Sequence, residues 1–172
     1  MCIEVDQSGK VEVLTVDTAL AFSDGIAASI LVPATVKREV YQRLKARGVK
    51  RKIIIVRMFA AGLFLLLVDH LESIETMVID VEYEGWDAEI RGVLLAHIRE
   101  VSPCVHKDQI VFGYVGKKSR AHKAALAVFR KTREPRKRMT ARELLNLLEQ
   151  KKKSGGRLYQ DARSLATPSG QG

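Results

Sequence analysis

A change of hydrophobic period at Pro33 divides this chain and limits the folds open to it. Three short apolar runs of extended character precede it, at residues 2–6, 11–16 and 26–32. Turn signals at Ser8-Gly9 and Asp24-Gly25 separate these runs, and glycine supplies the positive φ that a tight turn needs. Residues 1–32 therefore predict an antiparallel meander of three strands, with residues 18–22 prolonging the second strand.

After this point the pattern becomes helical. Val36, Val40 and Leu44 recur at the spacing of one helix face. Basic residues, Lys37 among them, fill the outer face, and Gly48 ends the helix. The first segment after the meander is therefore predicted to be an amphipathic helix with a cationic surface.

A second helix is predicted over residues 52–71. It is apolar nearly all round, so it should be buried in the core. Its start, residues 53–56, is β-branched, which leaves a strand as the alternative there. The apolar stretch 53–68 is short for a membrane span and contains Arg57, so we expect a core helix and no membrane contact.

The remainder of the chain alternates strands and helices. Strands are predicted at residues 76–83 and 110–115, and helices at residues 86–101, 121–131 and 140–150. Ser119 is a predicted N-cap, and Thr140 with Glu143 forms a capping box before the last helix. This order predicts one α/β domain over residues 1–150. Residues 151–172 are rich in Lys, Ser and Gly, which predicts a flexible basic tail.

The chain carries a net charge of +9, and the charge is segregated. Residues 1–36 are mostly acidic, whereas residues 37–57 and 117–157 are dominated by Lys and Arg. Such segregation favours nucleic acid as a partner. The two cysteines, Cys2 and Cys104, have no metal-binding spacing, and no secretory segment is visible. We therefore expect a protein of the reducing cytoplasm.

Two apolar runs end in acids. Asp6 closes the first strand, and Asp80 and Glu82 close the strand predicted from residue 76. Two neighbouring strands with a carboxylate at each carboxyl end can hold a divalent metal, and hard oxygen ligands suit Mg²⁺ or Mn²⁺. Asp87 at the start of the next helix is a further candidate. The alternatives are structural: Asp6 is then a turn residue, and Asp80 caps a strand or forms an ion pair.

With three antiparallel strands followed by the order αβαβα, the chain resembles the ribonuclease H-like superfamily over residues 1–132. The resemblance implies a mixed five-stranded sheet with helices on both faces, in which the first and fourth strands are parallel neighbours. Asp6 and Asp80 would then meet in the crevice at the carboxyl ends of the strands. The resemblance also implies a last acid or histidine on the helix after the fifth strand. In this chain the corresponding segment offers His122 and no carboxylate.

Two groups of cations are candidates for binding nucleic acid. The first crowds a helix N-terminus, where backbone N–H groups favour an anion, and consists of Lys117, Lys118, Arg120 and Lys123. The second lies in the linker before the last helix, where basic runs contact phosphates, and consists of Arg136, Lys137 and Arg138. Ordinary solvated charge is the alternative for both groups. The nearby aromatic residues Tyr114 and Phe129 are predicted to lie in the core.

These patterns predict a metal-dependent nuclease or resolvase-like protein that acts on nucleic-acid phosphodiesters. Asp6, Asp80 and Glu82 would hold the metal, and His122 would be a further catalytic residue. A scaffold without the last carboxylate can still bind nucleic acid, so the alternative is a non-catalytic nucleic-acid-binding or ribonucleoprotein accessory module of the same fold. A third hypothesis is docking to a protein partner, or to a second copy in a homodimer, through the 140–150 helix.

Overall fold

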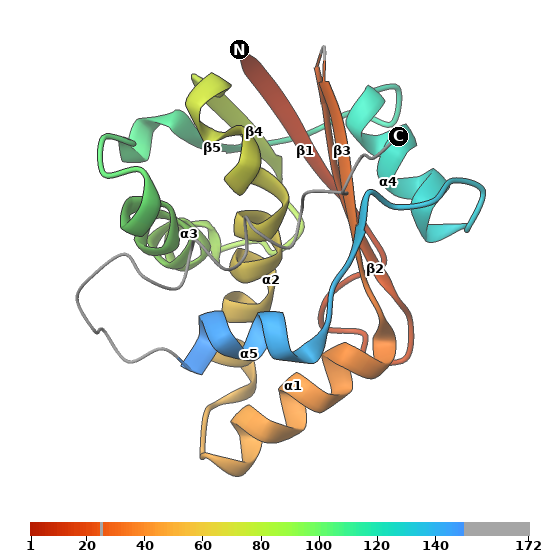
Figure 1. The fold of residues 1–172 in the computed structure, drawn as a ribbon, viewed down its shortest axis with the longest axis vertical. Coiled ribbons are helices and arrows are strands. Elements are labelled where there is room, and N and C mark those ends of the chain that lie inside the picture. The colour runs from red at the N-terminus through yellow and green to blue at the C-terminus, as the bar shows by residue number, and fades with distance from the viewer. Residues whose placement is uncertain (25, 150–172) are drawn as a thin grey trace, which may run out of the picture.

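The computed structural model describes residues 1–24 and 26–149, which form one mixed sheet with helices on both faces (Figure 1). The strands lie in the order β5-β4-β1-β2-β3-β6. Their bounds are β1 (Cys2–Ser8), β2 (Thr18–Asp24), β3 (Ile26–Val32), β4 (Thr76–Asp80), β5 (Ile110–Gly113) and β6 (Lys137–Arg138). β2 is antiparallel to β1 and β3, whereas β4 is parallel to both β1 and β5. The predicted α/β class is therefore confirmed, with six strands instead of five.

The additional strand, β6, lies where the sequence predicts a linker. Lys137 and Arg138 pair in parallel with β3. The N–H of Met139 continues the ladder to the carbonyl of Leu31, at 2.8 Å. A two-residue strand has no periodicity, so the sequence pattern cannot reveal it. The predicted basic tail, residues 151–172, lies outside the described residues.

The strand predicted at residues 11–16 is wrong, because the chain turns through this segment and β2 begins at Thr18. A buried cation holds the turns in place. The side chain of Lys37, on the helix that follows β3, is fully buried and donates three hydrogen bonds. They go to the carbonyl oxygens of Lys10 (3.0 Å) and Val13 (2.8 Å) and to the hydroxyl of Thr18 (2.8 Å). Three acceptors satisfy every donor of an ammonium group. Lys37 therefore faces inward, and its predicted place on the outer face is also wrong.

Gly9 begins this turning segment in the left-handed conformation, with φ of 76°. A Cβ atom at this position would lie 2.2 Å from the carbonyl oxygen of Asp17. The predicted requirement for glycine after Ser8 is confirmed, and the close backbone contact adds a second reason for it. Asp17 itself accepts a hydrogen bond from the N–H of Ala34 at 2.9 Å, which satisfies a free donor of the first helical turn.

The helices are α1 (Ala34–Ala46), α2 (Arg51–Leu67), α3 (Asp87–Val101), α4 (Arg120–Phe129) and α5 (Ala141–Glu149), with short 3₁₀ helices η1 (Val68–Ser73) and η2 (Lys107–Gln109). Each predicted helix is present, and residues 53–56 are helical, so the strand alternative there is wrong. The predicted caps are confirmed. Ser119 accepts from the N–H of Ala121, and the N–H of Thr140 donates to the carboxylate of Glu143.

The main core lies on one face of the sheet, around α2 (Figure 1). Alternate strand residues share a face, so β1 and β4 each send every second side chain into this core: Ile3, Val5, Met77 and Ile79. By length and hydropathy the segment Arg51–Ser73 resembles a membrane span, yet 67% of its most apolar window is buried within the fold. Leu144 and Leu145 of α5 are buried in the same core.

On the other face, α4 lies over β1, β2 and β3 (Figure 1). The contact is made by small side chains, with Ala124 and Ala125 of α4 packed on Ala21 of β2. Small residues allow a helix to approach a sheet closely. The first turns of α4 are therefore held against the carboxyl half of β1, which is the end of the strand that carries Asp6.

Candidate metal centre

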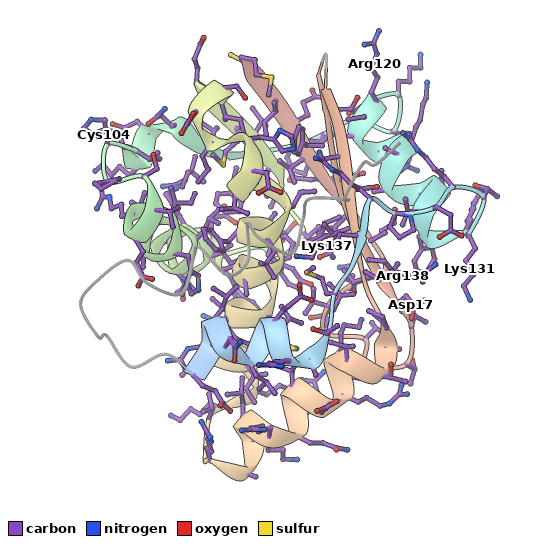
Figure 2. The ribbon with its side chains drawn as sticks, in the orientation of Figure 1. Asp17, Cys104, Arg120, Lys131, Lys137 and Arg138 are labelled. Atoms are coloured by element: carbon purple, nitrogen blue, oxygen red, sulfur yellow. The ribbon has the colours of Figure 1, made fainter. Side chains whose placement is uncertain are left out.

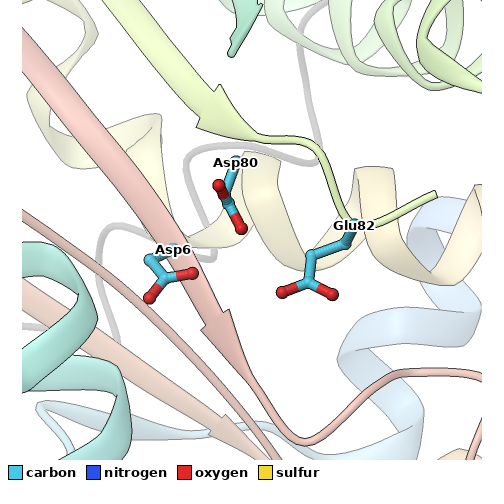
Figure 3. A group of neighbouring side chains, drawn as sticks. All are labelled: Asp6, Asp80 and Glu82. Atoms are coloured by element: carbon cyan, nitrogen blue, oxygen red, sulfur yellow. The ribbon is translucent and has the colours of Figure 1, made fainter. Parts of the chain in front are cut away.

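Three carboxylates converge at the carboxyl ends of β1 and β4. Asp6, Asp80 and Glu82 each offer an oxygen, and these oxygens lie within 4.8 Å of one another. Figure 3 shows the three side chains directed into a common space from β1, from the end of β4 and from the segment after β4. The structure thus brings together all three of the metal ligands predicted from the sequence.

The sheet register produces this convergence. β1 and β4 are parallel, and Val5 lies opposite Ile79, so the next residues along the two strands, Asp6 and Asp80, follow side by side. Val5 and Ile79 point into the core, and their successors therefore point to the other face. The acids therefore lie at the carboxyl ends of parallel strands, the edge at which α/β sheets usually bind ligands.

Asp6 is the most buried of the three acids, with 3% of its surface exposed. Its carboxylate accepts a hydrogen bond from the N–H of Gln7 at 2.8 Å. Its second oxygen lies 2.6 Å from Nδ1 of His122 on α4. Burial raises the pKa of Asp6 above its ordinary value, and the charge of Asp80 acts in the same direction, although the two hydrogen bonds oppose them. The two hydrogen bonds therefore fix the carboxylate in position, whereas burial and the charge of Asp80 disfavour its ionised form.

Asp80 is held by the backbone that follows β5. Its carboxylate accepts the N–H of Val115 at 2.7 Å. Beside this bond, the N–H of Val81 donates to the carbonyl of Gly113 at 3.2 Å, which continues the pairing of β4 with β5. One carboxylate oxygen is occupied by this contact, and the side chain is oriented by it.

Glu82 lies beyond the end of β4, so the expected strand over residues 76–83 is too long. The side chain is 20% exposed, and the ammonium of Lys10 approaches it to only 3.8 Å. Burial and then the charge of Asp80 raise the pKa of Glu82, the charge of Lys10 opposes them, and the charge of Asp6 raises it by a smaller amount. Because β4 ends at Asp80, strand alternation does not determine the position of Glu82 in the cluster.

The residue after Glu82 explains its position. Tyr83 is buried, and its hydroxyl accepts the N–H of Val11 at 3.0 Å and approaches the amide of Gln7 at 3.4 Å. Its ring lies edge-on to Phe59 and stacks on Trp86, with centroids 5.2 and 5.5 Å away. Tyr83 thus joins the segment that carries Glu82 to the chain that follows Asp6. This anchoring role was not predicted from the sequence. The signal that could have indicated it is an aromatic residue directly after the acids.

Other acids near this region stay out of the cluster. Glu84 is exposed, and Asp87 starts α3 with one carboxylate oxygen buried and unpartnered. Within the described residues, the group of side chains with a metal-binding arrangement contains only Asp6, Asp80 and Glu82. The fourth ligand proposed from the sequence, Asp87, is not part of it.

Among the described contacts, His122 touches one of the three acids, Asp6. It lies in the first turn of α4, which is anchored by the hydroxyl of Ser119 donating to Glu4 at 2.6 Å. When Nδ1 of a neutral imidazole donates to a carboxylate, Nε2 keeps its lone pair. A carboxylate that holds a histidine in this way fixes the tautomer and the ring orientation.

The two predicted groups of cations have different surroundings. Lys117, Lys118, Arg120 and Lys123 are exposed and have no ion pair within the described part of the chain. The linker cations have partners: Arg136 contacts His70, Lys137 pairs with Glu143, and Arg138 pairs with Glu134. Figure 2 labels Arg120 at one end of α4 and Lys137 and Arg138 on β6, beyond β3. Of the two groups, the one around α4 therefore has its charge uncompensated among the described residues.

An open cavity of about 500 Å³ lies over the first half of β1, and none of the three acids lines it. Its lining consists of Cys2, Ile3, Glu4, Ser23, Val78 and Arg120. Cys2 and Glu4 alternate with buried residues along β1, and Asp6 continues their row. The cavity therefore connects the first residue of α4 with the strand that leads to the metal-binding cluster.

The prediction that Tyr114 is a core residue is wrong, because 86% of its surface is exposed. It follows β5 directly and precedes Val115, whose N–H is bound by Asp80. Phe129 is partly buried and packs against a small cluster under α4. The strand-like run around Tyr114 suggested burial, but the strand ends at Gly113 and the ring lies outside the sheet.

Comparison with known proteins gives no relative from which a function can be transferred. The chain matches no protein-family model, and no curated protein or solved structure resembles it significantly. The geometry of the site is therefore the basis on which a function can be proposed.

Proposed function

We propose that this protein is a divalent-metal-dependent nuclease with a ribonuclease H-like fold, acting on nucleic-acid phosphodiesters in a resolvase-like manner. The observation that carries the proposal is the convergence of Asp6, Asp80 and Glu82, with oxygens within 4.8 Å of one another. The parallel pairing of β1 with β4 and the antiparallel meander β1-β2-β3 support the ribonuclease H-like assignment.

The acids fit Mg²⁺ or Mn²⁺ by their chemistry. All three are hard oxygen donors, and burial and mutual repulsion raise the pKa values of Asp6 and Glu82. A bound divalent ion would polarise a phosphoryl oxygen and make hydroxide available near neutral pH. The N–H of Val115 would orient the carboxylate of Asp80 through one of its oxygens. His122 would orient the carboxylate of Asp6 through the 2.6 Å contact.

The unpaired cations at the start of α4 would bind the phosphate backbone. Arg120 lines the cavity over the first half of β1, the strand that carries Asp6, and Lys123 lies one turn further along the helix. Such contacts are electrostatic and independent of sequence, so binding should weaken steeply as salt rises.

A second candidate is a nucleic-acid-binding module that does not cut. The observation in its favour is the absence of any carboxylate in residues 116–125, the segment that enters α4. Two aspartates and one glutamate form a small cage for two ions, and His122 is already engaged with Asp6.

The test is cleavage of branched, duplex and hybrid substrates in Mn²⁺, in Mg²⁺ and in chelator. We expect metal-dependent cutting that Asp80→Asn and Glu82→Gln abolish. Glu84→Gln is the matched control, because Glu84 is an exposed acid two residues away and outside the cluster. Binding without cutting in every metal, equal in all variants, would instead establish the binding module.

A further inference from the structure

Tyr114 is an exception among the exposed side chains of the described residues. The other exposed large hydrophobic residues within residues 1–24 and 26–149 are Val13, Val16, Ile53 and Val111, which are 37–41% exposed, whereas Tyr114 is 86% exposed. Burial of an aromatic ring is strongly favourable, so a ring left in water has a free face available for a ligand. Single exposed apolar residues are common, and the surroundings of Tyr114 must therefore decide its meaning.

The backbone on both sides of Tyr114 is fixed to the metal-binding cluster. Its predecessor, Gly113, is the register partner of Asp80. Its successor, Val115, is buried and donates its N–H to the Asp80 carboxylate at 2.7 Å. Tyr114 is thus placed at the carboxyl end of β5, within one residue of two contacts to a proposed metal ligand. An aromatic ring on so restrained a segment loses little conformational freedom on binding.

Cations follow the ring in sequence. Lys117 and Lys118 are exposed and have no ion pair among the described residues, and Arg120 follows at the cavity. An aromatic face beside unpaired cations is the combination with which proteins bind single-stranded nucleic acid: bases stack on the ring and the cations follow the backbone. The backbone that carries the ring is bound to Asp80, and the cations follow it in the sequence at residues 117, 118 and 120.

We infer that Tyr114 stacks on an unpaired base of the bound nucleic acid, so that the site prefers substrates with a single-stranded, frayed or branched nucleotide beside the scissile phosphate. The inference rests on the proposed function and specifies its substrate class. Within a regular duplex both faces of every base are covered by its neighbours, so a protein ring can stack only on a base that has left the stack. A fully paired duplex would contact the cations but not the ring.

The experiment compares Tyr114→Ala and Tyr114→Phe with the wild-type protein, in chelator so that nothing is cut. Affinity is measured for a single-stranded oligonucleotide and for the blunt duplex of the same sequence. A 2-aminopurine base in the single strand reports stacking by its fluorescence. Val16→Ala, an exposed apolar residue in the turn before β2, is the control for nonspecific surface effects.

We expect Tyr114→Ala to weaken single-strand binding by about 5- to 150-fold, the range measured for loss of one stacked base. It should leave duplex binding unchanged, and Tyr114→Phe should retain both affinity and fluorescence quenching. Equal affinity of wild type and Tyr114→Ala for the single strand would overturn the inference, as would an equal loss for both substrates.

These outcomes separate the inference from the proposed function. Metal-dependent cutting by a Tyr114→Ala protein with unchanged single-strand affinity removes the stacking role and leaves the nuclease intact. A wild-type protein that binds neither substrate and also cuts neither in Mg²⁺ or Mn²⁺ overturns both. The variants should fold normally, because Tyr114 has few neighbours to lose.

Discussion

The hydroxyl of Tyr83 accepts the backbone N–H of Val11 at 3.0 Å and so joins the two segments that leave β1 and β4. Glu82 directly precedes this tyrosine, and it lies outside any regular strand. The position of the third carboxylate is therefore determined by an aromatic anchor in the core. This relationship makes Tyr83 a positioning residue for the cluster, although its own side chain is no ligand.

Tyr83→Phe keeps the ring contacts and removes the hydroxyl. We expect a loss of about 1–3 kcal/mol in the free energy of unfolding, because the buried N–H of Val11 loses its partner. We also expect weaker Mn²⁺ binding, since Glu82 is less restrained. Urea unfolding and Mn²⁺ titration measure the two effects. Tyr41→Phe is the control, because the hydroxyl of Tyr41 has no hydrogen bond among the described contacts. Identical behaviour of the two variants would contradict the anchoring role.

Metal binding should raise the melting temperature of this protein. A ligand that binds only the folded state stabilises it by about 2.7 kcal/mol at one hundred times its dissociation constant. We expect Mn²⁺ to raise the melting temperature of wild type and Glu84→Gln, and to leave that of Asp80→Asn nearly unchanged. Differential scanning fluorimetry with and without chelator measures this. A shift of equal size in Asp80→Asn would place the ion elsewhere.

The same acids should destabilise the metal-free protein at neutral pH. The folded pKa of Glu82 is raised above its ordinary 4.5, so the folded state holds the proton more tightly than the unfolded state. The free energy of unfolding then falls as pH rises from about the ordinary pKa through the folded pKa. We expect Glu82→Gln to be more stable than wild type at pH 7 and to lose this advantage near pH 4.

Urea unfolding of both proteins at the two pH values measures the difference. The 3.8 Å contact of Glu82 with Lys10 opposes the gain only weakly, because Lys10 is half exposed. A Glu82→Gln protein less stable than wild type at pH 7 would show that the ion pair dominates the repulsion among the carboxylates.

Lys37 gives a second pH-dependent effect, of opposite sign. Burial lowers the pKa of Lys37 from 10.5 to about 8. Between these values the unfolded state binds more protons than the folded state, so the free energy of unfolding contributed by Lys37 rises with pH. We expect Lys37→Met to lose about 1–3 kcal/mol at pH 7, because three oxygens lose their donor. The deficit should grow between pH 8 and pH 10.

Lys45→Met is the matched control on the same helix, since Lys45 is exposed. We expect its stability to stay within about 0.5 kcal/mol of wild type. If the difference between wild type and Lys37→Met stays constant from pH 7 to pH 10, Lys37 does not titrate in this range.

A comparison of Gly9 with Gly85 tests separately the two reasons for a glycine, a positive φ and a lack of space for a Cβ atom. Both have positive φ, 76° and 78° respectively, but a Cβ at Gly9 would lie 2.2 Å from the oxygen of Asp17, whereas a Cβ at Gly85 meets nothing within 4 Å. We expect Gly85→Ala to cost about 1–2 kcal/mol from backbone strain alone. Gly9→Ala should cost clearly more, because the turn must move. Thermal unfolding of both variants measures this, and equal losses would contradict the steric argument.

The acids of the site were predictable because they end apolar runs. Asp6 lies in the second half of β1 and Asp80 is the last residue of β4, and earlier alternate residues of both strands enter the core, so the end of each apolar run marks the carboxyl edge of the sheet. The helices were predictable for the same reason: their periodicity is long and regular. Local sequence was sufficient wherever burial followed a repeating pattern.

The errors have a common cause in tertiary contacts. The run at residues 11–16 has the apolar content of a strand, but Lys37 binds its carbonyl at Val13 and holds it in turns. Tyr114 has the neighbours of a strand residue, yet its strand ends one residue earlier. In each case the deciding partner lies far away in the sequence, and no local pattern carries that information.

The positions of the two cysteines have a practical consequence. Both thiols are free and exposed, and Cys2 lines the cavity that Arg120 also lines, whereas Cys104 lies on the opposite side of the molecule from α4 (Figure 2). Alkylation followed by peptide mass spectrometry can therefore report occupancy of this cavity from the wild-type chain, with the distant thiol as an internal reference for reagent dose. Footprinting of this kind needs no engineered label.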